Sequence, residues 1–180
     1  MVIPPHDYSL FRKNNSQHKK YDVVSILRGN DFKLKGLQTY ADAVKVLGCK
    51  SMLITTSTSD RDLKNIKSLN VPFVLNQTKQ QVSEILGQSK TFFFPSYYES
   101  CPLVIYEALN AGCTIVSRDV GAVKEQLNGN GYVFTSDRDC VKLLRYGMDN
   151  LFSQDRLIER GLMFDRVNQL EKIQKCLDEV

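Results

Sequence analysis

Residues 91–112 read TFFFPSYYESCPLVIYEALNAG, a strand signal followed at once by a helix signal. The first four residues, Thr91–Phe94, are β-branched or aromatic and predict a short buried strand that runs into a polar loop. A helix is expected to begin at Cys101-Pro102 and to stop at Ala111-Gly112. The stretch therefore predicts a strand, a loop and a helix in direct succession.

Two acidic residues mark this stretch as a candidate ligand site. Glu99 lies in the loop after the strand, and Glu107 lies two turns into the helix. In an open parallel sheet, ligands bind in the crevice outside the carboxyl ends of the strands. The start of a helix also presents unpaired N–H groups, which suit an anion or a ring of hydroxyls. Taken without further context, Glu99 is better explained as a solvated loop acid, and Glu107 as half of a salt bridge to a lysine or arginine on a neighbouring element.

Similar strand and helix signals alternate over the rest of the chain. Apolar residues at helical spacing separate short β-branched runs, with Ser59 or Asp60 and then Thr78 as expected helix caps. This alternation predicts an α/β, Rossmann-like domain with three α/β/α layers and a parallel sheet of about six strands. The strands are expected at Tyr21–Leu27, Ser51–Thr55, Val71–Leu75, Thr91–Phe94, Cys113–Ser117 and Tyr132–Thr135.

After Asp137 the chain is expected to be helical. The last helix carries one apolar stripe, which is expected to pack on the chain's own sheet or on a partner. Its members are Met163, Val167, Leu170, Ile173 and Leu177.

Composition limits the classes of function. The chain has 180 residues, enough for one domain, and a net charge of +4 that is spread along the sequence. This charge fits weak attraction to phosphates or an anionic membrane surface, and nucleic-acid-binding motifs are absent. Five scattered cysteines, with no C-x-x-C pair, argue against a disulfide framework or a zinc site. Together with the absence of an apolar run near the ~20 residues of a membrane span, they predict a cytoplasmic protein with at most peripheral membrane contact.

The pattern P-S-x-x-E-S-C-P-L-x-x-x-E-A-L-x-x-G, over Pro95–Gly112, resembles the E-x7-E signature of retaining glycosyltransferases of the GT-B fold, glycosyltransferase family 4. The match is dense up to Gly121. The resemblance implies the C-terminal, donor-binding half of such an enzyme. It also implies a UDP- or GDP-linked sugar as donor substrate, with no cofactor and no metal, and transfer of a hexose to a glycan, lipid or other acceptor with retention at the anomeric carbon.

The amino-terminal stretch resembles another part of the same family. Residues 2–11, VIPPHDYSLF, are similar to the segment that joins the two domains of family members, with Pro5-His6 replacing the usual Asn-Gly-Val. This implies a linker-like segment over 1–20, a nucleotide-sugar-binding domain over 21–150 and C-terminal helices over 151–180. It also implies that an N-terminal acceptor domain or a partner subunit completes the enzyme.

The resemblance assigns roles within the signature. Glu99 would face the transferred sugar as a catalytic residue, and Glu107 would bind the ribose hydroxyls. The helix start would bind the diphosphate or sugar through its backbone. Its donor-binding residues are Ser100, Cys101, Pro102 and Leu103. A catalytic thiol at Cys101 is disfavoured because no histidine lies near it in the sequence.

Further roles follow the first and third strands. Arg28 and Lys35, with Lys33 as a substitute for Lys35, would neutralise the leaving diphosphate as catalytic cations. A solvated basic loop is the alternative for these residues. Residues 76–78, after the third strand, would approach the base, with Asn76 as the donor-binding residue.

Two hypotheses about function remain open. One is a working hexosyltransferase whose acceptor site comes from another domain. The other is a non-catalytic module that binds a sugar nucleotide or a partner. An upstream reading frame for a second Rossmann-like half would favour the enzyme, and a genuine start at Met1 without a partner would favour the module.

Overall fold

The protein folds around one parallel sheet. The structure is a computed structural model that describes residues 7–16 and 18–178. Its six strands pair in the order β3-β2-β1-β4-β5-β6, and every pair is parallel. The predicted α/β, Rossmann-like fold class is therefore confirmed. The strands are β1 (Tyr21–Arg28), β2 (Ser51–Thr56), β3 (Phe73–Leu75), β4 (Ser89–Phe94), β5 (Thr114–Arg118) and β6 (Gly131–Phe134).

Strand limits differ from the sequence-based expectations by one or two residues. β3 begins at Phe73 rather than Val71. Pro72 precedes it and has no N–H to give to a neighbouring strand. Its carbonyl still accepts a hydrogen bond of 3.0 Å from the Leu53 N–H, so the chain follows the sheet edge before regular pairing starts.

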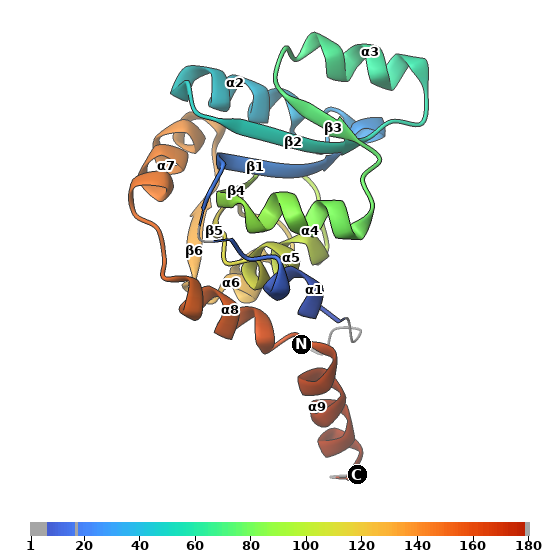
Figure 1. The fold of residues 1–180 in the computed structure, drawn as a ribbon, viewed down its shortest axis with the longest axis vertical. Coiled ribbons are helices and arrows are strands. Elements are labelled where there is room, and N and C mark those ends of the chain that lie inside the picture. Colours follow the sequence, from blue (N-terminus) through green and yellow to red (C-terminus); the bar gives the residue numbers. More distant parts are fainter. Residues whose placement is uncertain (1–6, 17, 179–180) are drawn as a thin grey trace.

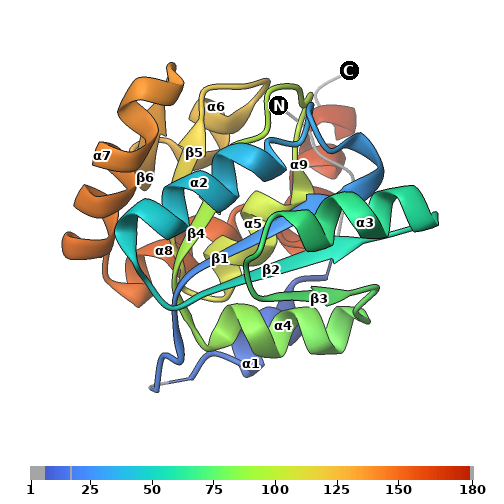
Figure 2. The same cartoon turned by 90° about the horizontal axis from the view of Figure 1, so that it is seen from above.

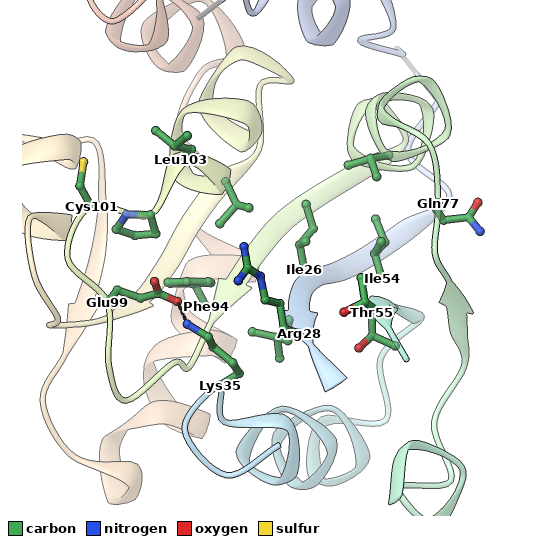
Figure 3. A pocket seen from close by; sticks show the side chains of 15 residues that line it. Ile26, Arg28, Lys35, Ile54, Thr55, Gln77, Phe94, Glu99, Cys101 and Leu103 are labelled. Atoms are coloured by element: carbon green, nitrogen blue, oxygen red, sulfur yellow. Dashed lines mark hydrogen bonds and ion pairs between the residues drawn. The ribbon is translucent and has the colours of Figure 1, made fainter. Parts of the chain in front are cut away.

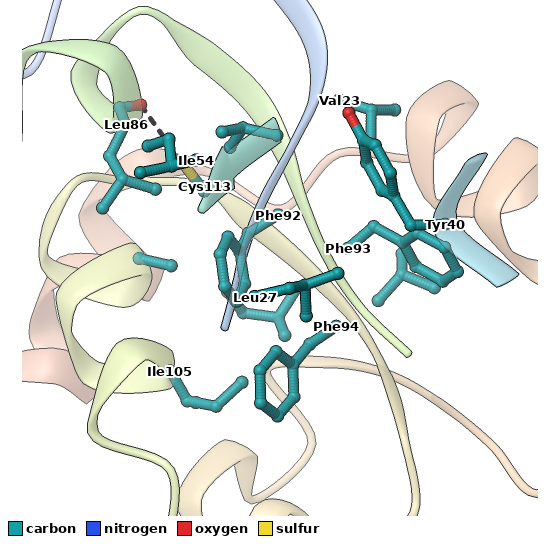
Figure 4. Close-up of a cluster of buried hydrophobic side chains, with 14 of the residues drawn as sticks. Val23, Leu27, Tyr40, Ile54, Leu86, Phe92, Phe93, Phe94, Ile105 and Cys113 are labelled. Carbon is teal, nitrogen blue, oxygen red and sulfur yellow. Dashed lines mark hydrogen bonds between the residues drawn. The ribbon is translucent and has the colours of Figure 1, made fainter. Parts of the chain in front are cut away.

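The central strand β4 is buried on both faces. Phe92 and Phe94 point to one face with ring centroids 5.9 Å apart, while Phe93 points to the other and lies 6.4 Å from the ring of Tyr40 (Figure 4). All three phenylalanines are at most 2% exposed. A strand covered on both faces needs a continuous apolar run, which explains the TFFF sequence.

Helices cover both faces of the sheet. α2, α3 and α7 lie on one face, and α1, α4, α5 and α8 lie on the other (Figures 1 and 2). The helices on the first face are α2 (Leu37–Leu47), α3 (Asp60–Ser68) and α7 (Asp137–Asp149). The helices on the second face are α1 (Ser9–Lys13), α4 (Lys79–Gly87), α5 (Leu103–Asn110) and α8 (Gln154–Leu162). Elsewhere lie α6 (Val123–Leu127), α9 (Arg166–Asp178) and a short 3-10 turn, η1 (Gly29–Asp31).

Side-chain caps fix where two helices begin. Ser59 accepts a hydrogen bond from the Asp62 N–H at the start of α3. Thr78 and Gln81 form a reciprocal capping box at the start of α4. Both helices therefore begin where the sequence predicts. α5 begins at Leu103, one or two residues later than expected, because Pro102 takes the cap position before the helix instead of its first turn.

The amino-terminal segment contains a helix that sequence reasoning missed. α1 packs on α4 and α5, and Arg12 binds Asp165 and Asn110 at 2.7 and 2.6 Å. These contacts tie the predicted linker-like segment to the body of the fold. Residues 2–6, where the linker resemblance begins, lie outside the described residues.

The last helix does not pack on the sheet. α9 extends away from the body, at the bottom of Figure 1. Met163 was predicted to belong to this helix but follows α8 and precedes α9. Of the predicted apolar stripe, Met163, Val167, Leu170 and Leu177 are exposed. The expectation that the stripe packs on the chain's own sheet is wrong, and the expectation that a partner covers it stays a prediction. Within residues 7–16 and 18–178, no helix is long and apolar enough to cross a membrane.

Candidate functional site

The strand order places a crevice between β1 and β4, where the sheet reverses its direction of winding. β1 pairs with β2 as far as Arg28–Thr56, but its pairing with β4 ends at Val24–Phe92. The two strands therefore separate towards their carboxyl ends, which is where open α/β sheets bind ligands. A cavity of about 410 Å³ lies there. It is lined by Ile26, Leu27, Arg28, Lys35, Ile54, Thr55, Thr56, Gln77, Val82, Phe94, Glu99, Cys101, Pro102, Leu103 and Val104 (Figure 3).

Arg28 is the last residue of β1 and reaches into this cavity (Figure 3). Its side chain is exposed and has no hydrogen bond or ion pair with any described residue. The next residue, Gly29, packs closely on β2, which fixes the end of β1 beneath the guanidinium. An unpaired guanidinium in a cavity is suited to bidentate binding of a phosphate or carboxylate.

Lys35 and Glu99 meet at one end of the cavity, near Arg28 (Figure 3). The Lys35 Nζ donates to the Glu99 Oε1 at 2.7 Å, and both side chains are less than one fifth exposed (Figure 3). Lys33 is exposed and does not line the cavity, so Lys35 is the lysine that the loop brings to Glu99. The predicted catalytic residues Arg28, Lys35 and Glu99 thus lie together, with Lys35 and Glu99 paired to each other.

Close backbone packing at Gly36 fixes the Lys35 loop. Gly36 has a φ of +69°, and a Cβ on it would lie 2.5 Å from the Pro95 carbonyl oxygen. The Tyr97 N–H also donates to the Leu34 carbonyl at 2.8 Å. Gly36 therefore allows the loop to lie directly on residues 95–97, which brings Lys35 next to Glu99.

A second glycine supports the Glu99 loop from the other side. Gly121 has a φ of +50°, and a Cβ on it would lie 2.2 Å from the Ser100 carbonyl oxygen. That carbonyl accepts a hydrogen bond of 2.8 Å from the Ala122 N–H. Ser100 is exposed and does not line the cavity. Its carbonyl is engaged in holding the loop that carries Glu99.

The start of α5 closes the cavity beside Arg28. Cys101, Pro102 and Leu103, to which the signature assigns donor binding, line it together with Val104 (Figure 3). No side chain caps the helix, so its first N–H groups are left for other partners. The Pro102 carbonyl accepts a hydrogen bond of 3.0 Å from the Gln126 side chain, which anchors the helix start.

Glu107 lies three residues beyond the cavity lining on α5. Burial raises the pKa of its carboxyl to about 7, and the positive charge of Lys79 offsets only part of that effect. Glu107 has no hydrogen bond or ion pair with any described residue, so the salt bridge considered as the alternative role is wrong for this structure. A half-buried acid without a partner is a group that a bound hydroxyl or cation would satisfy.

The raised pKa of Glu107 predicts a pH dependence of stability. Between about pH 4.5 and about pH 7 the folded chain keeps a proton that the unfolded chain has lost, so the free energy of unfolding falls as the pH rises through this window. Glu107→Gln is expected to remove about 3 kcal/mol of that fall. Urea unfolding of both proteins at about pH 5 and about pH 8 measures it. Glu84→Gln, which changes an exposed acid on α4, is the control and should show the same fall as the wild type. An equal fall in the free energy of unfolding between the two pH values in the wild type and in Glu107→Gln would contradict the prediction.

Asn76 lies outside the main cavity. It has a φ of +51°, and its side chain accepts a hydrogen bond of 3.3 Å from the Ser57 N–H. Gln77, the next residue, lines the cavity at the end opposite Glu99 (Figure 3). The sequence reasoning placed residues 76–78 near the base but named only Asn76 as a site residue, and it assigned no role to Thr55 or Thr56. Thr55 and Thr56 end β2, and their place at the carboxyl end of that strand was the signal that could have identified them.

No described group of histidine, cysteine, aspartate or glutamate residues is arranged to hold a metal ion. All five cysteines are free thiols. Among the residues that line the cavity, the cationic side chains are Arg28 and Lys35, and Lys35 is paired with Glu99.

Comparison with protein families decides the membership of this chain. Residues 56–161 match the model of the family described as glycosyl transferases group 1. The chain belongs to this family. The matched residues include Glu99, Glu107 and the start of α5, whereas Arg28 and Lys35 precede them. No curated protein sequence matches the chain.

Solved structures of glycosyltransferases share the fold. AviGT4, a glycosyltransferase involved in avilamycin A biosynthesis, matches with a TM-score of 0.77 and 18% identity over 97% of this chain and 56% of that chain. Sucrose-phosphate synthase from Thermosynechococcus elongatus matches with a TM-score of 0.76 and 15% sequence identity, over 99% of this chain and 51% of that chain. Anabaena Alr3699/HepE in complex with UDP-glucose matches with a TM-score of 0.73 and 16% sequence identity, over 98% of this chain and 56% of that chain. The predicted relation to GT-B glycosyltransferases is confirmed, and this chain spans about half the length of these structures.

Proposed function

We propose that this chain is the donor-binding half of a retaining glycosyltransferase that takes a hexose from a UDP- or GDP-linked sugar. The observation that carries the proposal is the cavity between β1 and β4, where an unpaired Arg28, Lys35 and the start of α5 surround Glu99. A cavity of about 410 Å³ lies within the range that suits a small-molecule ligand. Membership in a glycosyltransferase family supports the same class of ligand.

In this proposal the cations stabilise the leaving group. As the bond between the anomeric carbon and the diphosphate oxygen breaks, negative charge develops on the diphosphate. Arg28 and Lys35 would neutralise that charge without a metal. The free N–H groups at the start of α5 would stabilise the same negative charge further. The oxygen of the acceptor hydroxyl then bonds to the anomeric carbon on the face that the diphosphate leaves, and the hydroxyl proton passes to the departing diphosphate oxygen.

The acids would bind hydroxyl groups of the donor. The Glu99 carboxylate is suited to accept hydrogen bonds from the transferred sugar once Lys35 turns from it to the diphosphate. Glu107 would accept hydrogen bonds from the ribose hydroxyls, and its lack of a hydrogen-bond or ion-pair partner among the described residues supports this role. The carboxylate accepts hydrogen bonds in its charged form, so nucleotide affinity should rise with pH through about pH 7.

The acceptor site would come from another domain or subunit. The chain spans about half of the similar glycosyltransferase structures, and the exposed stripe on α9 offers an apolar surface to such a partner. A non-catalytic binding module is the alternative. The two differ in turnover: the enzyme half transfers hexose when the missing half is supplied, and the module binds the donor without transfer.

Calorimetric titration tests the proposal. The 180-residue chain is titrated with UDP, GDP, UDP-glucose and GDP-mannose, and one nucleotide series is expected to bind selectively. Glu107→Gln should weaken that series about tenfold, because one charge-assisted hydrogen bond is worth about 1.5–3 kcal/mol. Glu84→Gln should bind like the wild type. Absence of binding by all four ligands, or equal binding by the wild type and Glu107→Gln, would overturn the proposed site.

A further inference from the structure

A buried arginine lies behind the loop that carries Glu99, on the side away from the cavity lining. Arg118 ends β5 and is only 7% exposed. A guanidinium cannot lose its charge in a protein, so this burial requires partners on all sides. Those partners come from residues 95–97 and from the first turn of α7.

The guanidinium of Arg118 makes three kinds of contact. Its Nε donates to the Pro95 carbonyl at 3.1 Å, and a terminal nitrogen forms an ion pair with the Asp137 carboxylate. Its plane also lies over the ring of Tyr97, 3.9 Å from the centroid. The guanidinium thus donates directed hydrogen bonds and stacks its flat face on an aromatic ring at the same time. A lysine ammonium cannot make both kinds of contact.

Tyr97 and Asp137 complete the cluster. The Tyr97 hydroxyl donates to Asp137 Oδ2 at 2.6 Å and lies 2.9 Å from the Thr39 hydroxyl on α2. Desolvation opposes ionisation of Asp137, but hydrogen bonds from Tyr97 and Arg118 outweigh it and hold the pKa of Asp137 below its ordinary value. The Arg118 cluster, defined as Arg118, Tyr97 and Asp137, is thus a charged, hydrogen-bonded unit joining β5, α7 and the loop.

The loop transmits the position of this cluster to Glu99. Pro95 and Tyr97 are held by Arg118 on one side and by the backbone of Leu34 and Gly36 on the other. Ser96, between them, is fully buried, and its hydroxyl lies 3.2 Å from Glu99 Oε1. The Glu99 carboxylate is therefore hydrogen-bonded to the same short segment, residues 95–97, that Arg118 contacts.

We propose that Arg118, Tyr97 and Asp137 are positioning residues that fix residues 95–97 so that Glu99 faces the sugar of the bound donor. The inference rests on the proposed function, in which Glu99 binds the sugar while Arg28 binds the diphosphate. Loosening the cluster should therefore weaken recognition of the sugar and spare recognition of the nucleoside diphosphate. A merely structural role would weaken both equally.

The test uses Arg118→Lys, which keeps the charge, and Asp137→Asn, which keeps the shape. Lys124→Ala is the matched control, since it breaks the exposed ion pair of Lys124 with Asp119 just beyond β5. Dissociation constants are measured for UDP with UDP-glucose and for GDP with GDP-mannose, below the unfolding temperature of each variant. The ratio of the sugar nucleotide's dissociation constant to that of its nucleoside diphosphate is expected to rise about tenfold in both variants, because losing one charge-assisted hydrogen bond between Glu99 and the sugar weakens affinity by about tenfold or more. It should stay at the wild-type value in Lys124→Ala.

A ratio that stays at the wild-type value in both variants, or two constants that rise equally, would overturn the positioning role. Amide hydrogen exchange gives a second readout that needs no ligand. Exchange at the Tyr97 amide, which donates to the Leu34 carbonyl, should accelerate in Arg118→Lys, while the Phe92 and Phe93 amides of β4 keep their wild-type rates. Unchanged exchange at the Tyr97 amide would overturn the inference by itself. If the wild type binds no nucleotide, the proposed function fails, and the exchange result still decides whether the cluster holds the loop.

Discussion

Replacing Arg28 with alanine is expected to weaken binding of the preferred nucleoside diphosphate about 100-fold. Arg28 is the cation that lines the cavity without a partner among the described residues, so the wild type loses no ion pair when a phosphate binds to it. Two charge-assisted hydrogen bonds to phosphate, each worth about 1.5–3 kcal/mol, account for the size of the effect. Calorimetric titration of the wild type and the variant measures it.

Two companion variants sharpen this experiment. Arg28→Lys keeps the charge but loses the planar fork, and its affinity should fall between those of the wild type and Arg28→Ala. Arg61→Ala removes an exposed arginine on α3, outside the cavity, and should bind like the wild type. Equal affinity of Arg28→Ala and Arg61→Ala would mean that the diphosphate does not lie at the end of β1.

Gly36→Ala is expected to lower the free energy of unfolding by about 3 kcal/mol or more. Its φ of +69° is unfavourable for alanine, and the new Cβ would lie 2.5 Å from the Pro95 carbonyl oxygen. Because backbone atoms must move to relieve this contact, Lys35 should also shift away from Glu99. Urea unfolding gives the change in stability, and titration with the preferred sugar nucleotide gives the change at the site.

Gly48 provides the matched control at the other end of α2. It has a similar φ of +61°, but a Cβ there would meet no atom within 4 Å. Gly48→Ala should therefore cost only about 1 kcal/mol, the price of the left-handed conformation alone. Equal losses of stability in the two variants would show that the contact between Gly36 and Pro95 contributes nothing.

The sequence predicts the sheet well because its signals are local. The phenylalanines of residues 92–94 can be satisfied only by a strand buried on both faces, and the caps at Ser59 and Thr78 use residues three positions away. Such patterns need no knowledge of the tertiary fold. The crevice also follows from local signals, since Arg28 ends β1 and Glu99 lies in the loop after β4.

The environment of the site residues could not be predicted in the same way. Arg118 looks like a solvated charge at a strand end, and its burial depends on Pro95 and Asp137, which are 23 and 19 residues away. The choice of Lys35 over Lys33 depends on the path of the loop over Pro95. The pairing of Lys35 with Glu99 joins residues 64 positions apart, beyond the reach of any sequence pattern considered.

The exposed stripe on α9 illustrates the same limit. Helical spacing identified it correctly as apolar, but spacing does not tell which surface covers it. In the structure Val167 and Leu177 are 64% and 66% exposed, and α9 leaves the body of the fold.

The central claim is that a nucleoside diphosphate binds in the crevice between β1 and β4. Amide chemical-shift mapping of the isotopically labelled chain with UDP and with GDP tests it most directly. The largest shift changes are expected at Arg28, Lys35, Gln77 and Leu103, which line the crevice from four separate segments. Changes centred instead on the second cavity, between β6 and α7 around Tyr146, would contradict the claim, as would an unchanged spectrum at saturating nucleotide.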